Sequence, residues 1–170
     1  MHDKVFPEHA VKQALAELDI DRSDDGILTV MQCDLTTLCL TTVLRGAMVS
    51  CLLRKRKFLN DADISYALCS CTLPVSSRSS RDIGFLLDSR YFGALCAQHC
   101  KLLAKVLEPE FAMMKQVAEV KISAETQVLV QRAVERVVRG VLEHFASEAQ
   151  GGPYGFRELD RCLRSLTGEP

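Results

Sequence analysis

The stretch MQCDLTTLCLTTVLRGAMVSCLLRKRKFLNDADISYAL, residues 31–68, decides the fold. From Met31 to Lys57 it contains no proline and only the glycine Gly46. Apolar side chains recur at helical spacing, which is typical of a long helix with one buried stripe. At about 1.5 Å per residue the helix would be about 40 Å long, so it needs a partner packed across its middle. The stripe consists of Leu38, Val43 or Leu44, Met48, Cys51 and Leu52.

A basic run, residues 54–57, is expected to close this helix, because cations interact favourably with the negative end of a helix dipole. Asn60 is then a good N-cap for a second helix, with Asp61 and Asp63 in its first turn. That helix is expected to end near Leu68. The stretch therefore predicts a long helix, a short basic loop and a short helix.

The rest of the chain predicts the same order of helices twice. A short helix over Pro7–Leu18 and a polar loop precede the first long helix. Residues 71–88 include the run VSSRSSRD without helical periodicity, and we interpret them as a solvated linker. Ser123 is a good N-cap for the second long helix, and the run GGPYG at 151–155 stops it. The helices expected in the second half span Ser89–Leu107, Glu110–Glu119, Ala124–Gln150 and Phe156–Leu166.

Apolar stripes are expected on two of these helices. The first is Leu95, Leu102, Leu103 and Val106; the second is Val130, Val134, Val137 or Val138, Val141, Leu142 and Phe145. The charged residues Arg132, Glu135, Arg136 and Arg139 are interpreted as a solvated face of the second long helix.

Long helix, short basic loop and short helix resemble the second half of a histone fold. In that family an arginine before the loop pairs with an aspartate at the start of the last helix, and Arg56 and Asp63 stand at the matching positions of RKFLNDAD. Through RKRKFLNDADISYAL the first half is similar to the smaller arginine-rich core histone. Residues 102–119, LLAKVLEPEFAMMKQVAE, resemble the larger arginine-rich histone where an extra N-terminal helix meets the first fold helix. From residue 7 to residue 166 the chain thus resembles the fused histone doublets of some large DNA viruses.

The resemblance implies an all-α protein in which two tandem histone folds form an intramolecular handshake pseudo-dimer. Residues 1–70 would form the first fold, 71–88 a Ser/Arg linker, and 89–170 a second fold with an extra N-terminal helix. One histone fold cannot bury its own long helix. Joining two folds in one chain raises their effective concentration to roughly millimolar.

In histone pairs, DNA lies where the first loop of one fold meets the second loop of the other. The resemblance implies that Arg56 and Asp63 form a structural clamp at one such place. At the opposite place GGPYG offers no basic residue and no arginine to pair with Asp160, so DNA contact is less expected there. The residues implied in DNA binding are Arg22, Arg45, Arg54, Lys55, Lys57 and Lys121.

The charge balance leaves two functions open. The chain has 21 basic and 22 acidic residues and a formal net charge of −1, whereas proteins that wrap DNA unaided carry a basic excess. In the first hypothesis, the chain is a structural histone doublet that assembles with other histone-fold proteins to bind and compact double-stranded DNA in a nucleosome-like particle. The alternative is a histone-fold scaffold subunit of a transcription, chromatin or viral assembly, which binds protein more than DNA.

Other functional classes receive less support. The 8 cysteines are interpreted as free thiols, because Cys69, Cys71, Cys96, His99 and Cys100 match no zinc motif; no metal or cofactor is expected. The sequence shows no HExxH and no glycine-rich phosphate loop, so we do not expect an enzyme. Without a signal peptide or a membrane span in the sequence, we expect the nucleus, a viral factory or the virion interior, and no secretion or membrane partner. Self-association is expected through the second fold, near residues 143–166.

Overall fold

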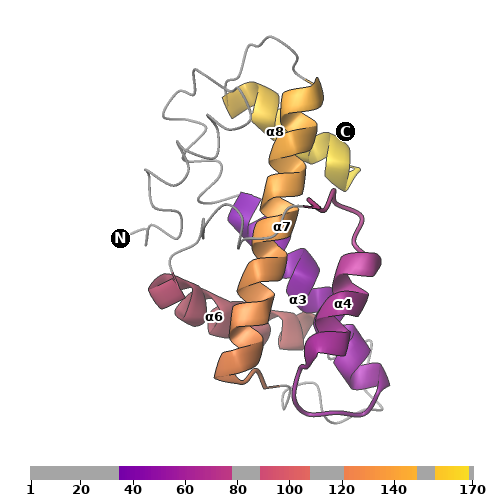
Figure 1. The fold of residues 1–170 in the computed structure, drawn as a ribbon, viewed down its shortest axis with the longest axis vertical. Coiled ribbons are helices and arrows are strands. Elements are labelled where there is room, and N and C mark those ends of the chain that lie inside the picture. The colour runs from indigo at the N-terminus through magenta and orange to yellow at the C-terminus, as the bar shows by residue number, and fades with distance from the viewer. Residues whose placement is uncertain (1–34, 78–88, 108–120, 149–155, 169–170) are drawn as a thin grey trace.

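The computed structural model describes residues 35–77, 89–107, 121–148 and 156–168 (Figure 1). These ranges are helical apart from their connecting segments, and they contain no strand beyond an isolated bridge between two residues. The expected all-α class is therefore confirmed. Arg22 and the helices expected at Pro7–Leu18 and Glu110–Glu119 lie outside the described residues. The helices are α3 (Thr36–Leu53), α4 (Asp61–Cys69), α6 (Ser89–Leu107), α7 (Ala124–Glu148) and α8 (Phe156–Thr167).

The helix α7 runs along the molecule, and α3 passes obliquely behind it and contacts it (Figure 1). α4, α6 and α7 all pack on α3, which explains why its buried face is broader than one stripe. Val43 and Leu44 are both fully buried, and Leu38 is half-buried. The predicted stripe of α7 is buried from Val130 to Phe145. The two long helices thus share one core.

The first long helix ends earlier than predicted. α3 stops at Leu53, not at Lys57, because Lys55 adopts a left-handed backbone conformation with φ 56°. The amide of Lys55 donates to the carbonyl of Leu52 (3.0 Å) and that of Arg56 to the carbonyl of Cys51 (3.0 Å). This pair of hydrogen bonds is the Schellman pattern that terminates many helices. The basic run therefore forms the loop after the helix and not its last turn.

The start of the linker is packed, not solvated as the sequence suggested. Leu73 and Ser76 are buried, and the amide of Ser76 donates to the carbonyl of Arg136 on α7 (2.9 Å). The Ser76 hydroxyl donates to Glu143 (2.7 Å), also on α7. A Cβ on Gly140 would lie 2.8 Å from the amide nitrogen of Val75 and still closer to the carbonyl group of Pro74. The glycine thus provides the space in which the linker crosses the helix.

Of two further predicted surfaces, the α6 stripe is right at Leu95 and Leu103 only, and the solvated face of α7 is wrong. On α6, Leu102 and Val106 are more than half exposed, whereas Phe92, Cys96, Leu103 and Leu107 are buried. These residues are spaced by four, seven and four, and Cys100 in the longer interval is partly buried, so the true stripe lies beside the one expected. On α7, the predicted solvated face includes Glu135 at 1% and Arg139 at 8% exposure, and is therefore largely buried.

Candidate nucleic-acid interface

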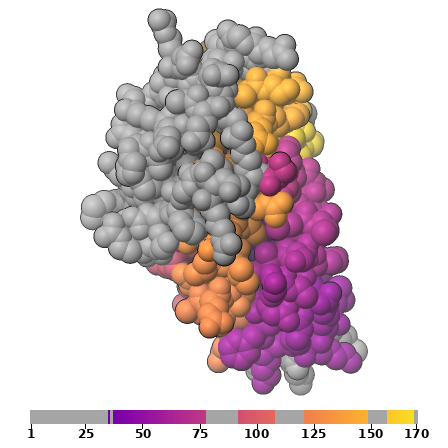
Figure 2. All heavy atoms as spheres, viewed as in Figure 1, coloured from indigo at the N-terminus to yellow at the C-terminus, as the bar shows by residue number. Residues whose placement is uncertain are grey.

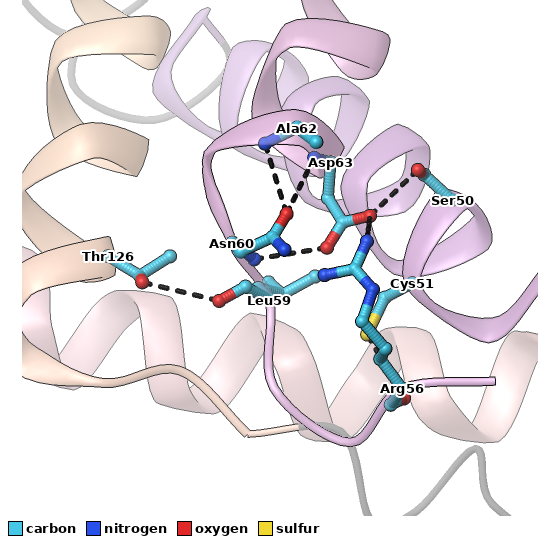
Figure 3. A network of polar contacts seen from close by, with 8 residues as sticks. All are labelled: Ser50, Cys51, Arg56, Leu59, Asn60, Ala62, Asp63 and Thr126. Carbon is cyan, nitrogen blue, oxygen red and sulfur yellow. Dashed lines mark hydrogen bonds and ion pairs between the residues drawn. The ribbon is translucent and has the colours of Figure 1, made fainter. Parts of the chain in front are cut away.

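The basic loop after α3 leads into a strongly capped helix. The Asn60 side chain accepts hydrogen bonds from the amides of Ala62 (3.0 Å) and Asp63 (3.3 Å). In return the Asp63 carboxylate accepts one from the amide of Asn60 (3.0 Å), which completes a capping box. The predicted N-cap is confirmed. This reciprocal arrangement fixes where the loop ends and α4 begins (Figure 3).

The same carboxylate fastens the loop to α3. Asp63 Oδ1 accepts from Arg56 Nη2 at 2.7 Å and from Ser50 Oγ at 2.8 Å, while Asp63 itself is fully buried (Figure 3). A buried carboxylate is tolerated when a cation and further hydrogen bonds satisfy it. Arg56 and Asp63 thus form the ion pair that the resemblance implies. Ser50, which the sequence did not single out, connects this pair to α3.

The loop after α3 is joined by main-chain hydrogen bonds to the segment that precedes α7. Phe58 and Lys121 form a parallel bridge, in which the Lys121 amide donates to the carbonyl of Lys57 (2.7 Å) and its carbonyl accepts from the amide of Leu59 (3.0 Å). The Thr126 hydroxyl on α7 donates to the Leu59 carbonyl at 3.2 Å (Figure 3). We call residues 54–60 and 121–123 the loop pair. It brings together parts of the two halves that are far apart in sequence.

The N-terminus of α7 directly follows residues 121–123 of the loop pair. Ser123 caps this helix, since its hydroxyl oxygen accepts from the amide of Thr126 (3.2 Å), as predicted. Helix N-termini carry partial positive charge and favour anions. In the space-filling view the surface of the α3–α4 half adjoins that of the start of α7 at the lower end of the molecule (Figure 2).

The structure places four of the predicted DNA-binding residues in the loop pair. All four are exposed, and two exposed acids, Asp61 and Glu125, lie close to them in sequence. Because Asp63 is already paired with Arg56, the exposed cations outnumber these exposed acids among the described residues of the loop pair and the two helix starts beside it. The four residues are Arg54, Lys55, Lys57 and Lys121.

One predicted residue is separated from this group. Arg45 is exposed on α3, but it precedes Arg54 by about 13 Å of helix length. The loop pair therefore does not include it.

Among the described residues, the other short helix shows no equivalent clamp. Asp160 on α8 forms an ion pair with Arg164 one turn later on the same helix (3.2 Å), and their side chains are 40% and 58% exposed. This pair bridges no two elements. Exposed pairs of this kind contribute little to stability.

Cys51 lies under the loop as a structural thiol. It is fully buried, and its Sγ donates to the carbonyl of Arg56 at 3.1 Å (Figure 3). Burial raises the pKa of the Cys51 thiol, the neighbouring Asp63 raises it further, and Arg56 partly opposes both. The thiol therefore stays protonated at neutral pH. Within the described ranges, no three potential metal-ligating side chains lie together.

Comparisons of the chain with protein-family models, with curated proteins and with solved structures found no match. None of the helices in the described ranges is long and apolar enough to cross a lipid bilayer. The interpretation of function therefore depends on the loop pair and the Arg56–Asp63 clamp.

Proposed function

We propose that the chain is a tandem histone-fold protein that binds double-stranded DNA through the loop pair. The observation that carries the proposal is the parallel bridge between Phe58 and Lys121. It pairs the loop that follows one long helix in the sequence with the segment that precedes the other long helix. This is the arrangement expected of two histone folds in a handshake. In this view α3 and α4 end the first fold, and α7 and α8 end the second.

The chemistry of the loop pair suits the phosphate backbone. Its four exposed cations supply charge, and the N-termini of α4 and α7 add partial positive charge. The clamp and the bridge hold this surface in a fixed geometry, because both the side chain of Asp63 and the main chain of Lys121 anchor the loop. Contacts of this kind position a duplex without reading its sequence.

The loop pair alone should bind weakly. About four phosphate contacts predict a slope near −3.6 for log K against log salt, so a rise from about 50 to 200 mM salt would weaken binding roughly 100-fold. The net charge of −1 adds no general attraction for DNA. We therefore propose that the protein compacts DNA only when assembled with other histone-fold chains in a nucleosome-like particle.

The test is a titration of labelled duplex DNA over this range of salt, with the protein alone and with candidate histone-fold partners. Replacing Lys55 and Lys57 with glutamate should weaken binding and flatten the salt slope. The double replacement of Lys101 and Lys105, two exposed lysines on α6, with glutamate changes the net charge by the same amount and serves as the charge-matched control. No duplex binding at low salt, with or without partners, would contradict the proposal.

Lys55→Gly separates binding from folding. Glycine adopts the positive φ of this position more readily than lysine, so the variant should be as stable as the parent or more stable by up to about 1 kcal/mol. Its DNA affinity should nevertheless fall, and the salt slope should flatten by about 1, because one phosphate contact is lost. Unchanged affinity in a folded Lys55→Gly variant would remove this residue from the interface.

The alternative proposal is a scaffold subunit that binds protein more than DNA. It is favoured by the near-neutral charge and by the Asp160–Arg164 pair, which lies within α8 and, unlike the Arg56–Asp63 pair, joins no loop to a helix. Partner binding that survives both the glutamate double variant and high salt, without duplex binding, would support it.

A further inference from the structure

Phe58 is an aromatic residue on the surface of the loop pair. Its exposed fraction is 56%, whereas Phe92 and Phe145 are fully buried in the core. The ring therefore keeps apolar surface in contact with water in the middle of a basic loop, and a ligand with a flat apolar face would gain free energy by covering it.

The bridge determines where this ring points. Side chains alternate along an extended segment, and Leu59, next to Phe58, is buried at 2% exposure. Phe58 therefore projects outward. Residues paired across a bridge project to the same side, so exposed Lys121 stands beside the ring. The outward face thus combines an aromatic ring with a cation.

The main chain under the ring is held on both sides. The Lys57 carbonyl and the Leu59 amide are bonded to Lys121, and the Leu59 carbonyl accepts from Thr126. Covering the ring would therefore restrict little beyond its own side-chain torsions. A preorganised aromatic surface binds more tightly than a mobile one.

We propose that Phe58 and Lys121 form a stacking site for an unpaired nucleobase, so that the loop pair binds single-stranded nucleic acid more tightly than its charges alone provide. An exposed ring beside a cation is an arrangement by which proteins hold single strands, with bases on the ring and phosphates on the cations of the groove. In an intact duplex the faces of the bases are covered by their neighbours. The proposal shares its surface with the proposed function and rests on that surface being a nucleic-acid site.

The probes are two labelled strands of about 20 nucleotides: oligo(dT), and an abasic deoxyribose-phosphate strand of the same length. The abasic strand presents the same phosphates without bases. The parent protein should bind oligo(dT) at least about fivefold more tightly than the abasic strand. Phe58→Ala should remove this difference and leave abasic binding unchanged, and its largely exposed site makes it compatible with folding.

Matched variants test the site directly. Tyr66→Ala removes another exposed aromatic residue, on the second turn of α4, and should keep the preference for bases. The chain has no tryptophan, so Phe58→Trp introduces a unique fluorophore. Oligo(dT) should quench its emission, and the abasic strand should not.

The outcomes distinguish this proposal from the proposed function. Equal binding of both strands by the parent, or equal weakening of both by Phe58→Ala, would overturn the stacking site even if duplex DNA is bound. A base preference without duplex binding would uphold the stacking site and overturn the proposed function. If Phe58→Ala lost duplex binding and kept the preference for oligo(dT), the stacking site would be overturned, and Phe58 would instead insert between paired bases of a duplex. Binding of no strand at all would overturn both proposals.

Discussion

Asp63 and Asp160 both lie in the first half of a short helix that follows a long one, but they are used differently. Asp63 is fully buried and accepts hydrogen bonds from Arg56, Ser50 and the amide of Asn60. Asp160 is partly exposed and pairs with Arg164 of its own helix. Among the described residues, Asp63 joins three elements, whereas the ion pair of Asp160 stays within one helix. The comparison teaches that an aspartate at this place in the sequence does not make a clamp unless a preceding arginine reaches it.

The two ends also differ in how they are fastened. At the loop-pair end, the fastening is an ion pair and a main-chain bridge. Further along α7, it is the linker that packs against the helix, through the space left by Gly140 and the hydrogen bond from Ser76 to Glu143. An ion pair thus contributes to the attachment at the loop-pair end, whereas close packing against a glycine contributes to the attachment of the linker.

The largest expected effect distinguishes the two aspartates. Asp63→Ala should lower the free energy of unfolding by about 3 kcal/mol, because it leaves the Arg56 guanidinium and the Ser50 hydroxyl without their buried acceptor. Asp160→Ala is the matched control and should cost about 0.5 kcal/mol or less, since its pair is exposed. Denaturant unfolding of both variants measures the difference. Equal losses would mean that the clamp does not set the stability of this end.

The next effect concerns the packed linker. Gly140→Ala should destabilise the protein by about 1 to 3 kcal/mol, although alanine normally favours a helix, because its Cβ would collide with the backbone of Pro74 and Val75. Gly93→Ala on α6 is the control. Its Cβ would approach only the end of the flexible Gln127 side chain, at 2.8 Å, so stability should stay the same or rise. Thermal unfolding compares them, and a stabilised Gly140→Ala variant would show that the linker does not lie on α7.

The smallest effect appears in alkaline solution and is shared by both ends. Burial raises the pKa of Cys51 under the loop pair and that of Cys162 on α8. Well below the unfolded thiol pKa of about 8.5, each thiol is protonated in both the folded and the unfolded state, so pH does not change the free energy of unfolding. As the pH rises through this value the unfolded chain loses its thiol protons before the folded protein does, so the free energy of unfolding falls. The loss is at most about 0.8 kcal/mol per thiol at pH 9.

Unfolding free energies measured from pH 7 to pH 9 test this slope. Cys51→Ala should flatten it more than Cys162→Ala, since Cys51 is fully buried and Cys162 is not. A slope that neither substitution changes would assign the alkaline loss to other groups.

Local signals in the sequence predicted the parts of the fold that local chemistry controls. The N-caps Asn60 and Ser123, the start of α7 and its buried stripe follow from capping preferences and helical periodicity. The pairing of Arg56 with Asp63 was implied only by resemblance, and the structure contains it.

The remainder depends on tertiary contacts that periodicity does not encode. α3 ends early because Lys55 has a positive φ, and the chain then places Arg56 against Asp63. Lysine rarely adopts a positive φ, so the sequence does not predict this end of the helix. The linker looked solvated because its serines and arginines are polar, but Gly140 sixty-odd residues away gives it a place to pack. Phe58 was missed at the site because an apolar residue in a loop is usually assigned to the core.

The packing of α7 across α3 also has a consequence for biosynthesis. α4 and α6 are made before α7, so they can cover their parts of α3 early, but the part of α3 that α7 covers stays exposed until α7 has been made. At common translation rates, roughly 5 to 20 s separate the synthesis of Leu53 from that of Glu148. During that interval the nascent chain carries an apolar surface that its own later residues have yet to cover, and that surface is open to contact with other proteins.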